Sequence, residues 1–250
     1  MIEMNRLAQN IIIIALFSLL SGCKPDTICD CFKSTGDLIW EDYEISNVTV
    51  VELHNNIDLF IHSDSIERVM LYAGSNLIEK IEVTQSDSIL TLRNYNSCNC
   101  VRDFNSPVEV HLYTKNAHTI KYFGYGNIKN DEPITGSSFY LSITDGYGDI
   151  DLNLQTHHVI VDFNSGGSTI TLKGNADFLG SYVGAAGRLD AQNLKTRITY
   201  LNHMSVVDQY VWAENDLDIR IHSIGNIYYK GNPQINIMSQ TGSGKVLPIE

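Results

Sequence analysis

The sequence lacks the signatures of the common enzyme classes. Its 250 residues contain no serine nucleophile elbow, no phosphate-binding loop and no zinc-protease helix motif. No long run with the period of an α-helix follows residue 22. We therefore expect a protein that is not an enzyme and that uses no cofactor.

Positive charge is also scarce. Only 17 Lys and Arg residues stand against 29 Asp and Glu residues, which gives a formal net charge of −12. Binding to nucleic acid depends on neutralising phosphates with basic side chains, and peripheral binding to anionic lipid depends on the same attraction. We expect neither nucleic acid nor an anionic lipid surface as an electrostatic partner.

Long apolar runs are absent except for one near the start, Ile11 to Phe17, which is too short to span a membrane. With Arg6 before it, this run has the form of a signal-peptide core. It leads into Leu20-Ser21-Gly22-Cys23, which resembles the lipobox of bacterial lipoproteins. The resemblance implies cleavage before Cys23 and attachment of lipid there, whereas the alternative is an ordinary signal peptide followed by a chance cysteine.

This interpretation divides the chain into three parts. We expect a lipoprotein signal peptide over 1–22, a lipidated tether over 23–33 and one folded domain over 34–250. Such a protein is anchored by lipid in the bacterial cell envelope, most simply at the outer membrane. Whether it faces the periplasm or the cell exterior is left open.

A glycine-marked repeat dominates the second half of the chain. Around the glycines, apolar and polar residues alternate, as in Ile150, Leu152 and Leu154, so each short strand has one inward face. A period of about 20 residues is typical of stacked units that bury a continuous core. The marking glycines are Gly126, Gly148, Gly167 and Gly187, at spacings of 22, 19 and 20 residues.

We therefore predict an all-β fold of the parallel β-helix or β-solenoid class, with glycine-marked turns about every 20 residues. The alternative is an antiparallel meander with glycine hairpins. The strand-like run from Val206 to Ala213 falls where the next repeat is due, although it has no glycine. Solenoid ends must be capped or paired, so a homo-oligomer formed through an end or an edge is also expected.

Four further cysteines form two C-x-C pairs. In an exported chain, an even number of cysteines is first interpreted as disulfide-bonded, and cross-pairing between the two motifs avoids a strained ring within either one. A four-thiolate metal site and free thiols are the alternatives. The candidates are Cys29, Cys31, Cys98 and Cys100.

Several motifs together resemble a known family. They are Phe32-Lys33-Ser34-Thr35-Gly36, Asn76-Leu77-Ile78-Glu79-Lys80-Ile81, the Gly-x-Gly-x-Ile repeats and the closing run from Gly225 to Pro233. This chain is similar to the putative auto-transporter adhesin, head GIN domain family, over nearly all of its length after residue 22. The resemblance implies a right-handed β-helix and a role in adhesion, and it supplies no catalytic residues to transfer.

Two clusters are candidates for chemistry. Asp145, Asp149 and Asp151 gather near one turn, where a calcium ion would find oxygen ligands. Solvated turn aspartates are the simpler interpretation, so we expect no metal. Aromatic residues near the first two repeats form the candidate binding patch, with stacked ladders along the solenoid as the alternative. These residues are Tyr122, Phe123, Tyr125 and Tyr147.

The functional prediction is a lipid-anchored, non-enzymatic binding or adhesion module for a glycan or protein ligand. The alternative is a calcium-dependent carbohydrate-active β-helix enzyme that resembles polysaccharide lyases and uses the aspartate cluster. An enzyme needs acidic and basic groups that converge in a groove, whereas a binding module needs only a shallow surface.

Overall fold

The computed structural model describes residues 34–96 and 107–249. The predicted lipidation site Cys23 and the four disulfide candidates lie outside these residues, so they remain predictions. No helix within the two described segments is long and apolar enough to cross a membrane. The one short helix of these two segments, η3 (Ile78–Lys80), is a single 3₁₀ turn.

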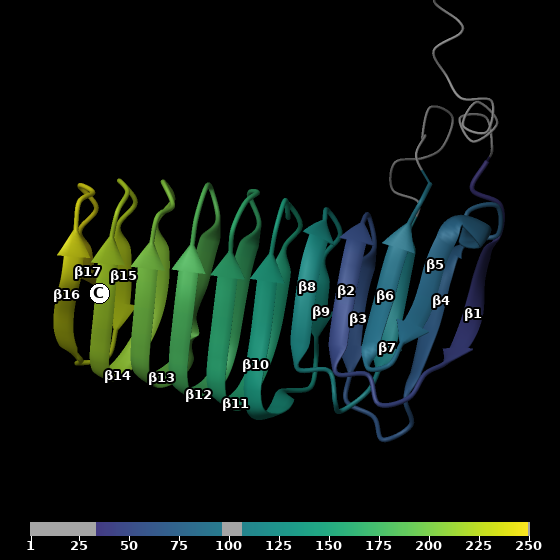
Figure 1. Cartoon of the computed structure of the whole chain (residues 1–250), viewed down its shortest axis with the longest axis horizontal. Coiled ribbons are helices and arrows are strands. Elements are labelled where there is room, and N and C mark those ends of the chain that lie inside the picture. The colour runs from purple at the N-terminus through teal and green to yellow at the C-terminus, as the bar shows by residue number, and fades with distance from the viewer. Residues whose placement is uncertain (1–33, 97–106, 250) are drawn as a thin grey trace, which may run out of the picture.

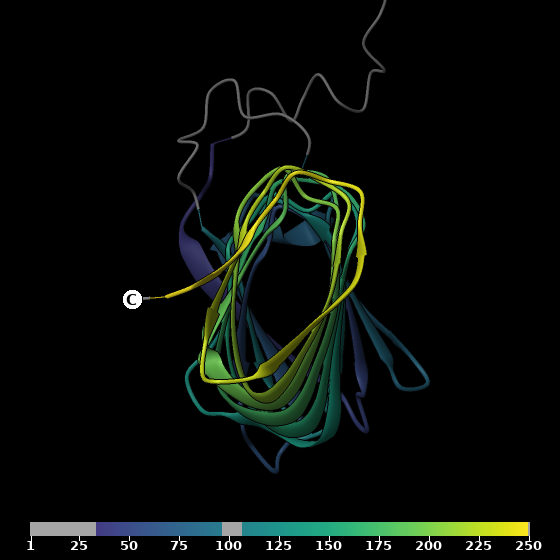
Figure 2. The same ribbon diagram turned by 90° about the vertical axis from the view of Figure 1, so that its left-hand side faces the viewer.

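The strands join into one 17-stranded sheet that winds as a solenoid of about six turns (Figures 1 and 2). The predicted all-β solenoid with parallel stacked strands is confirmed. Its first strands are β1 (Leu38–Glu44), β2 (Val50–Asn55), β3 (Asp58–His62), β4 (Arg68–Gly74), β5 (Ile81–Ser86), β6 (Ile89–Asn94), β7 (Val108–Tyr113), β8 (Thr119–Gly124) and β9 (Ile128–Asn130). The remaining strands are β10 (Ile134–Ile143), β11 (Ile150–Phe163), β12 (Thr169–Val183), β13 (Arg188–His203), β14 (Gln209–Ile221), β15 (Ile227–Lys230), β16 (Gln234–Gln240) and β17 (Val246–Pro248).

Each turn of the solenoid has two faces. In β11, β12 and β13 the first half of the strand lies on one face and the second half on the other, with a bend between them. The first face stacks Ile150 on Ile170 and Ile170 on Leu189, all in parallel register. These side chains are fully or almost fully buried, so the predicted alternation places one apolar face in a continuous core.

The first part of the solenoid departs from purely parallel pairing. β4 pairs antiparallel with both β1 and β7, and β5 pairs antiparallel with β6. The connection between β5 and β6 has only two residues, Asp87 and Ser88, and Asp87 has a positive φ of 52°. So short a connection permits a hairpin but not a parallel crossover. A mixed sheet therefore closes this end of the core.

The solenoid has two edges that differ in construction. At the turn edge the chain passes from the second face to the first, and the repeats there contain the glycines. A Cβ atom on Gly148 would lie 1.9 Å from the carbonyl oxygen of Gly126, so the stacked turns leave no space for a side chain. We define the turn edge by 125–127, 144–149, 164–168, 184–187, 204–208, 222–226 and 241–245.

At the opposite, corner edge the chain bends from the first face to the second. Three glycines with positive φ, Gly136, Gly174 and Gly231, lie at or beside this edge, but they do not recur on every turn as the marking glycines do. In the repeats we define the corner edge by 131–133, 155–157, 175–177, 195–197, 214–215 and 231–233.

Polar side chains replace the missing glycine of the fifth repeat. Gln209 is fully buried, its Oε1 accepts a hydrogen bond from the Leu189 amide at 2.6 Å, and its Nε2 donates to the carbonyls of Gly187 and Val207. Ser205 Oγ also donates to the Gly187 carbonyl, at 2.8 Å. These bonds satisfy backbone groups of a turn that is built without glycine.

His203 occupies a core position beside Val183 and Ile221. It is fully buried, its Nε2 lies 2.8 Å from the Gly225 carbonyl, and its Nδ1 has no hydrogen-bond partner among the described residues. The bond to a carbonyl requires Nε2 to carry the proton. Burial lowers the pKa of His203 below its usual 6.5, because a charged imidazole here would be poorly solvated.

His203 should therefore make the fold sensitive to acid. The unfolded chain takes up a proton on this side chain near pH 6.5 while the folded chain resists it, so the free energy of unfolding falls as the pH drops below about 6.5. We expect His203→Leu to weaken this dependence in melting curves recorded between pH 8 and pH 5. The exposed His118→Gln serves as the control, and an unchanged pH dependence in His203→Leu would contradict the assignment.

The described residues that flank the four cysteine candidates lie close together. Asn76 Nδ2 donates to the Ser34 carbonyl at 3.1 Å, and Asn96 Nδ2 donates to the Leu77 carbonyl at 3.0 Å. Ser34 follows Cys31 by three residues, and Asn96 precedes Cys98 by two. The described residues nearest in sequence to the two C-x-C motifs are thus neighbours in the fold.

We accordingly expect cross-paired disulfides between the motifs. The non-reduced protein should resist alkylation at Cys29, Cys31, Cys98 and Cys100, and peptide mapping should recover linked peptides from the two regions. A first bridge would close a loop of about 70 residues and add about 4 kcal/mol in the chain-entropy model. Full alkylation without reductant would exclude the bridges.

Candidate binding groove

The structure separates the members of the predicted aromatic patch. Tyr122 is fully buried, and its hydroxyl donates to the Gly126 carbonyl at 2.6 Å. Burial raises the pKa of Tyr122 to about 12. Including Tyr122 in a surface patch was therefore wrong.

The other three residues of the predicted patch lie at or near the surface. Phe123 is half-buried and stacks on His54. Tyr125 and Tyr147 are exposed and stack on each other with 6.0 Å between ring centroids.

The calcium corner that was the alternative for Asp145, Asp149 and Asp151 is not assembled among the described residues. Asp145 accepts a hydrogen bond from Ser165 Oγ at 2.7 Å, and Asp151 forms an ion pair with Lys173 at 3.3 Å. Within the described segments, no group of three acidic, histidine or cysteine side chains could hold a metal ion. The aspartate cluster therefore gives no support to the alternative of a calcium-dependent enzyme.

An aromatic ladder that the sequence analysis missed crosses β1, β4, β7 and β3. Trp40 stacks on Tyr72 at 4.6 Å, and Phe60 stacks on His111 at 4.8 Å. The stacked rings cover one another, whereas Trp40 at the β1 end of the ladder remains 50% exposed. In the sequence, the aromatic residues of the ladder occupy the outward-facing positions of β1, β3, β4 and β7. The ladder consists of Trp40, Phe60, His62, Tyr72, His111 and Tyr113.

Within this ladder, His62 Nε2 lies 3.0 Å from His111 Nδ1, and His111 Nε2 lies 3.5 Å from a Glu109 carboxylate oxygen. One imidazole donates to the other across this distance, and the tautomers of the two rings decide which one is the donor. Burial and the neighbouring His111 lower the pKa of His62. The pair joins β3 and β7.

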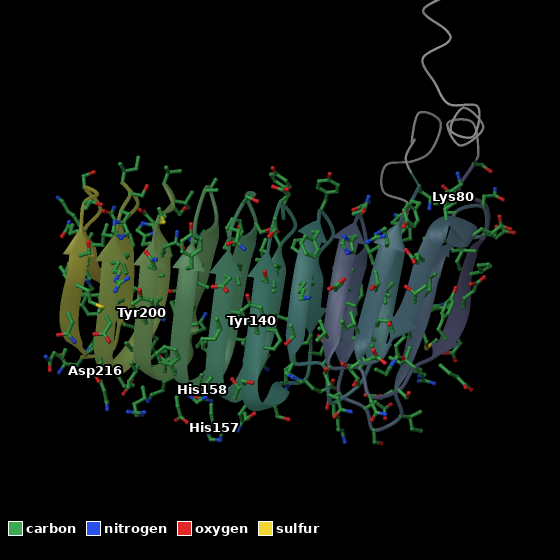
Figure 3. The ribbon with its side chains drawn as sticks, in the orientation of Figure 1. Lys80, Tyr140, His157, His158, Tyr200 and Asp216 are labelled. Carbon is green, nitrogen blue, oxygen red and sulfur yellow. The ribbon has the colours of Figure 1, made fainter. Side chains whose placement is uncertain are left out.

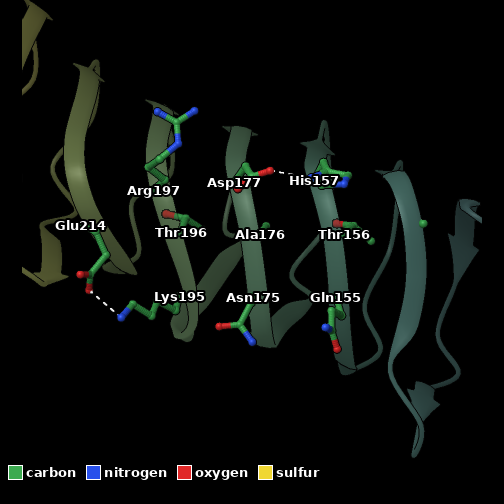
Figure 4. A pocket seen from close by; sticks show the side chains of 11 residues that line it. Gln155, Thr156, His157, Asn175, Ala176, Asp177, Lys195, Thr196, Arg197 and Glu214 are labelled. Carbon is green, nitrogen blue, oxygen red and sulfur yellow. Dashed lines mark hydrogen bonds and ion pairs between the residues drawn. The ribbon is translucent and has the colours of Figure 1, made fainter.

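A groove with a volume of about 510 Å³ lies at the corner edge of the repeats (Figure 4). Thr156, Ala176 and Thr196, from β11, β12 and β13, form its floor. Thr156 and Thr196 are buried, and the small size of all three residues leaves the floor hollow. The groove thus follows three successive turns of the solenoid.

Polar residues form two walls along this floor. Each wall takes one residue from each of the three strands, at a sequence spacing of 20 (Figure 4). One wall consists of Gln155, Asn175 and Lys195, and the other of His157, Asp177 and Arg197. This spacing was not recognised in the sequence because the marking glycines, which indicated the repeat, lie at the other edge.

The charges of the groove are largely paired. His157 Nδ1 lies 2.6 Å from Asp177 Oδ2, and Lys195 Nζ lies 3.5 Å from a Glu214 oxygen. The hydrogen bond from His157, with the nearby positive charges, holds the pKa of Asp177 below its usual value, so this carboxylate stays ionised. Besides His157, the groove contains two basic and two acidic residues, so their formal charges balance.

Three groove side chains remain free to bind a ligand. In the described part of the chain, Gln155, Asn175 and Arg197 make no side-chain hydrogen bond to protein. The two amides each offer donors and an acceptor, and the guanidinium offers donors only. This arrangement suits a ligand with many hydroxyl groups better than one with a strong charge.

The sequence profile of the family described as putative auto-transporter adhesin, head GIN domain, matches residues 47–233. The chain belongs to this family. Among functionally curated proteins, none is significantly similar to this head GIN domain protein.

Several solved structures have a similar fold. A putative adhesin from Bacteroides fragilis superimposes with a TM-score of 0.78 at 20% identity, over 87% of this chain and 100% of its own. A putative adhesin from Parabacteroides distasonis gives a TM-score of 0.60 at 18% identity, over 87% and 100%. A putative lipid binding protein from the same species gives 0.66 at 18%, over 87% and 99%. At such identities these likenesses show the fold alone.

Proposed function

We propose that this head GIN domain protein is a lipid-anchored, non-enzymatic adhesion module of the cell envelope that binds a neutral glycan chain in the corner groove. The observation that carries the proposal is the groove itself, with free amides above a floor of small residues. Its volume lies within the usual range for ligand sites. Membership of a family described as adhesins supports a binding role at the cell surface or envelope.

The pattern of charges favours binding over catalysis. The groove contains both acidic and basic groups, as an enzyme would need, but each acid is already paired with a base. A glycoside hydrolase needs a carboxyl group that stays protonated through a raised pKa. Asp177 is shifted in the opposite direction.

The form of the groove favours an extended ligand. Consecutive turns repeat the same wall positions at the strand spacing of about 4.8 Å. A chain that lies along the axis would meet an amide from Gln155 and then one from Asn175. Hydroxyl groups can both donate to and accept from such amides. A strongly anionic chain would meet Asp177 and Glu214 beside each basic residue.

The double variant Gln155→Ala/Asn175→Ala tests the groove. Each lost hydrogen bond should cost about 1 kcal/mol, so affinity for neutral oligosaccharides that bind the wild-type protein on a glycan array should fall about 10-fold or more. Asn232→Ala, an exposed amide outside the groove, is the matched control. Equal affinity in the double variant, or release of glycan products by the wild-type protein, would overturn the proposal.

The lipid anchor rests on the lipobox-like run that ends at Cys23. Cys23→Ser should move the protein made in cells from the detergent phase to the aqueous phase. The variant carries no acyl chains, and these chains are what retain the wild-type protein in detergent. The mass of the mature N-terminus provides the second measurement. A wild-type protein without acyl mass on Cys23 would exclude the anchor.

A further inference from the structure

We propose that the turn edge is a membrane-contact surface, so that the solenoid lies with its axis along the bilayer and inserts its turn tips between the lipid headgroups. The proposal extends the proposed function and rests on the lipid anchor at Cys23. It assigns the lipid surface itself as the partner of this edge.

Exposed apolar side chains concentrate at this edge. Of twelve large exposed hydrophobic residues in the described segments, five lie on the turns of the repeats, and Leu38 and Tyr95 continue the row toward the N-terminal end. At the corner edge the corresponding side chain is Ile66 alone among the described residues. The five are Tyr125 (61% exposed), Tyr147 (59%), Met204 (44%), Val206 (56%) and Ile224 (66%).

Charge is distributed in the opposite way. The turns of the repeats carry four charged residues, whereas the shorter corner bends carry six. Those of the turn edge are Asp145, Asp149, Asp208 and Lys245. Those of the corner edge are Asp131, Glu132, Asp177, Lys195, Arg197 and Glu214. The edge that is rich in apolar side chains is thus also the edge with the lower density of charge.

The chain enters the fold at the same edge. β1 begins opposite the end of β4, and β7 begins opposite the same end, where the first-face strands start. Ser34 is hydrogen-bonded to Asn76 in the connection that follows β4. Figure 3 shows Lys80, from this connection, at one edge of the solenoid and His157 at the other.

The tether is too short to hold the domain far from the membrane. The eleven residues from Cys23 to the start of the described structure span at most about 40 Å when fully extended. A lipid on Cys23 therefore keeps the turn edge near the bilayer, where even weak contacts are formed often.

The composition of the edge selects the kind of lipid surface. Tyrosine favours the headgroup region, and Ile and Val can enter the boundary of the acyl chains. The edge lacks the basic cluster that anionic lipid attracts, and its formal charge is negative. Contact should therefore be apolar, independent of salt and formed with neutral lipids.

This orientation also directs the groove. The groove lies at the corner edge, opposite the membrane contact, so it opens away from the bilayer. A solenoid that lies on the membrane thus presents its ligand site to whatever approaches the membrane from the solvent.

The experiment places the mature lipidated protein in vesicles of phosphatidylcholine and phosphatidylethanolamine whose acyl chains carry bromine, a quencher of tryptophan fluorescence. Ile224→Trp reports from the turn edge, and Ile66→Trp reports from an equally exposed site at the corner edge. The signals of Trp40 and Trp212 are subtracted with the wild-type protein. Equal melting temperatures confirm that both variants fold.

We expect the added fluorescence of Ile224→Trp to be strongly quenched at both low and high salt, and that of Ile66→Trp to be unchanged. Vesicle-bound protein with equal, negligible quenching at both sites would overturn the membrane contact while leaving the anchor intact. Protein that fails to float with the vesicles would instead contradict the anchor. A blue shift of Ile224→Trp without quenching would assign the edge to contact between copies of the chain and would also overturn the proposal.

Discussion

Parallel backbone pairing between consecutive turns is the constraint on which the rest of this structure depends. A single turn has only a few inward residues and cannot bury them alone, so each turn depends on hydrogen bonds and apolar stacking from its neighbours. The register Ile128–Ile150–Ile170–Leu189 shows how consistently the chain meets this condition. Where a turn departs from the pattern, as at Gln209, buried hydrogen bonds maintain the pairing.

The same constraint makes the surface linear. Any outward position recurs about 20 residues later on the next turn, so residues of one kind collect in rows. The two polar walls of the groove recur in this way, and the apolar tips of the turns gather along one edge. The aromatic ladder arises differently, through the side-by-side pairing of β1, β4, β7 and β3 in the mixed first part. Each of these three features follows the axis, and each belongs to a different part of the cross-section.

The sequence predicted those parts of the fold that recur in every repeat. Alternation and glycine spacing indicated the strands, the turns and the stacking, because a stacked turn leaves no room for a side chain at Gly148. The antiparallel strands at the start of the sheet were not predicted. Strands joined by a hairpin and strands joined by a crossover have the same alternating pattern, so only the connection distinguishes them. Tyr122 was misplaced because an aromatic residue beside a turn can face either way. The groove was missed because the glycines with a regular spacing lie at the other edge, although the 20-residue spacing of His157, Asp177 and Arg197 was visible.

The antiparallel strands at the start of the sheet have a consequence for how the family can change in length. Because β1, β4 and β7 close that end, a duplicated turn can be accommodated only within the parallel part or at its far end. Duplication there would lengthen both edges together and leave the cross-section as it is. A change in the number of repeats would therefore change the length of the protein along the solenoid axis, while its thickness stays constant.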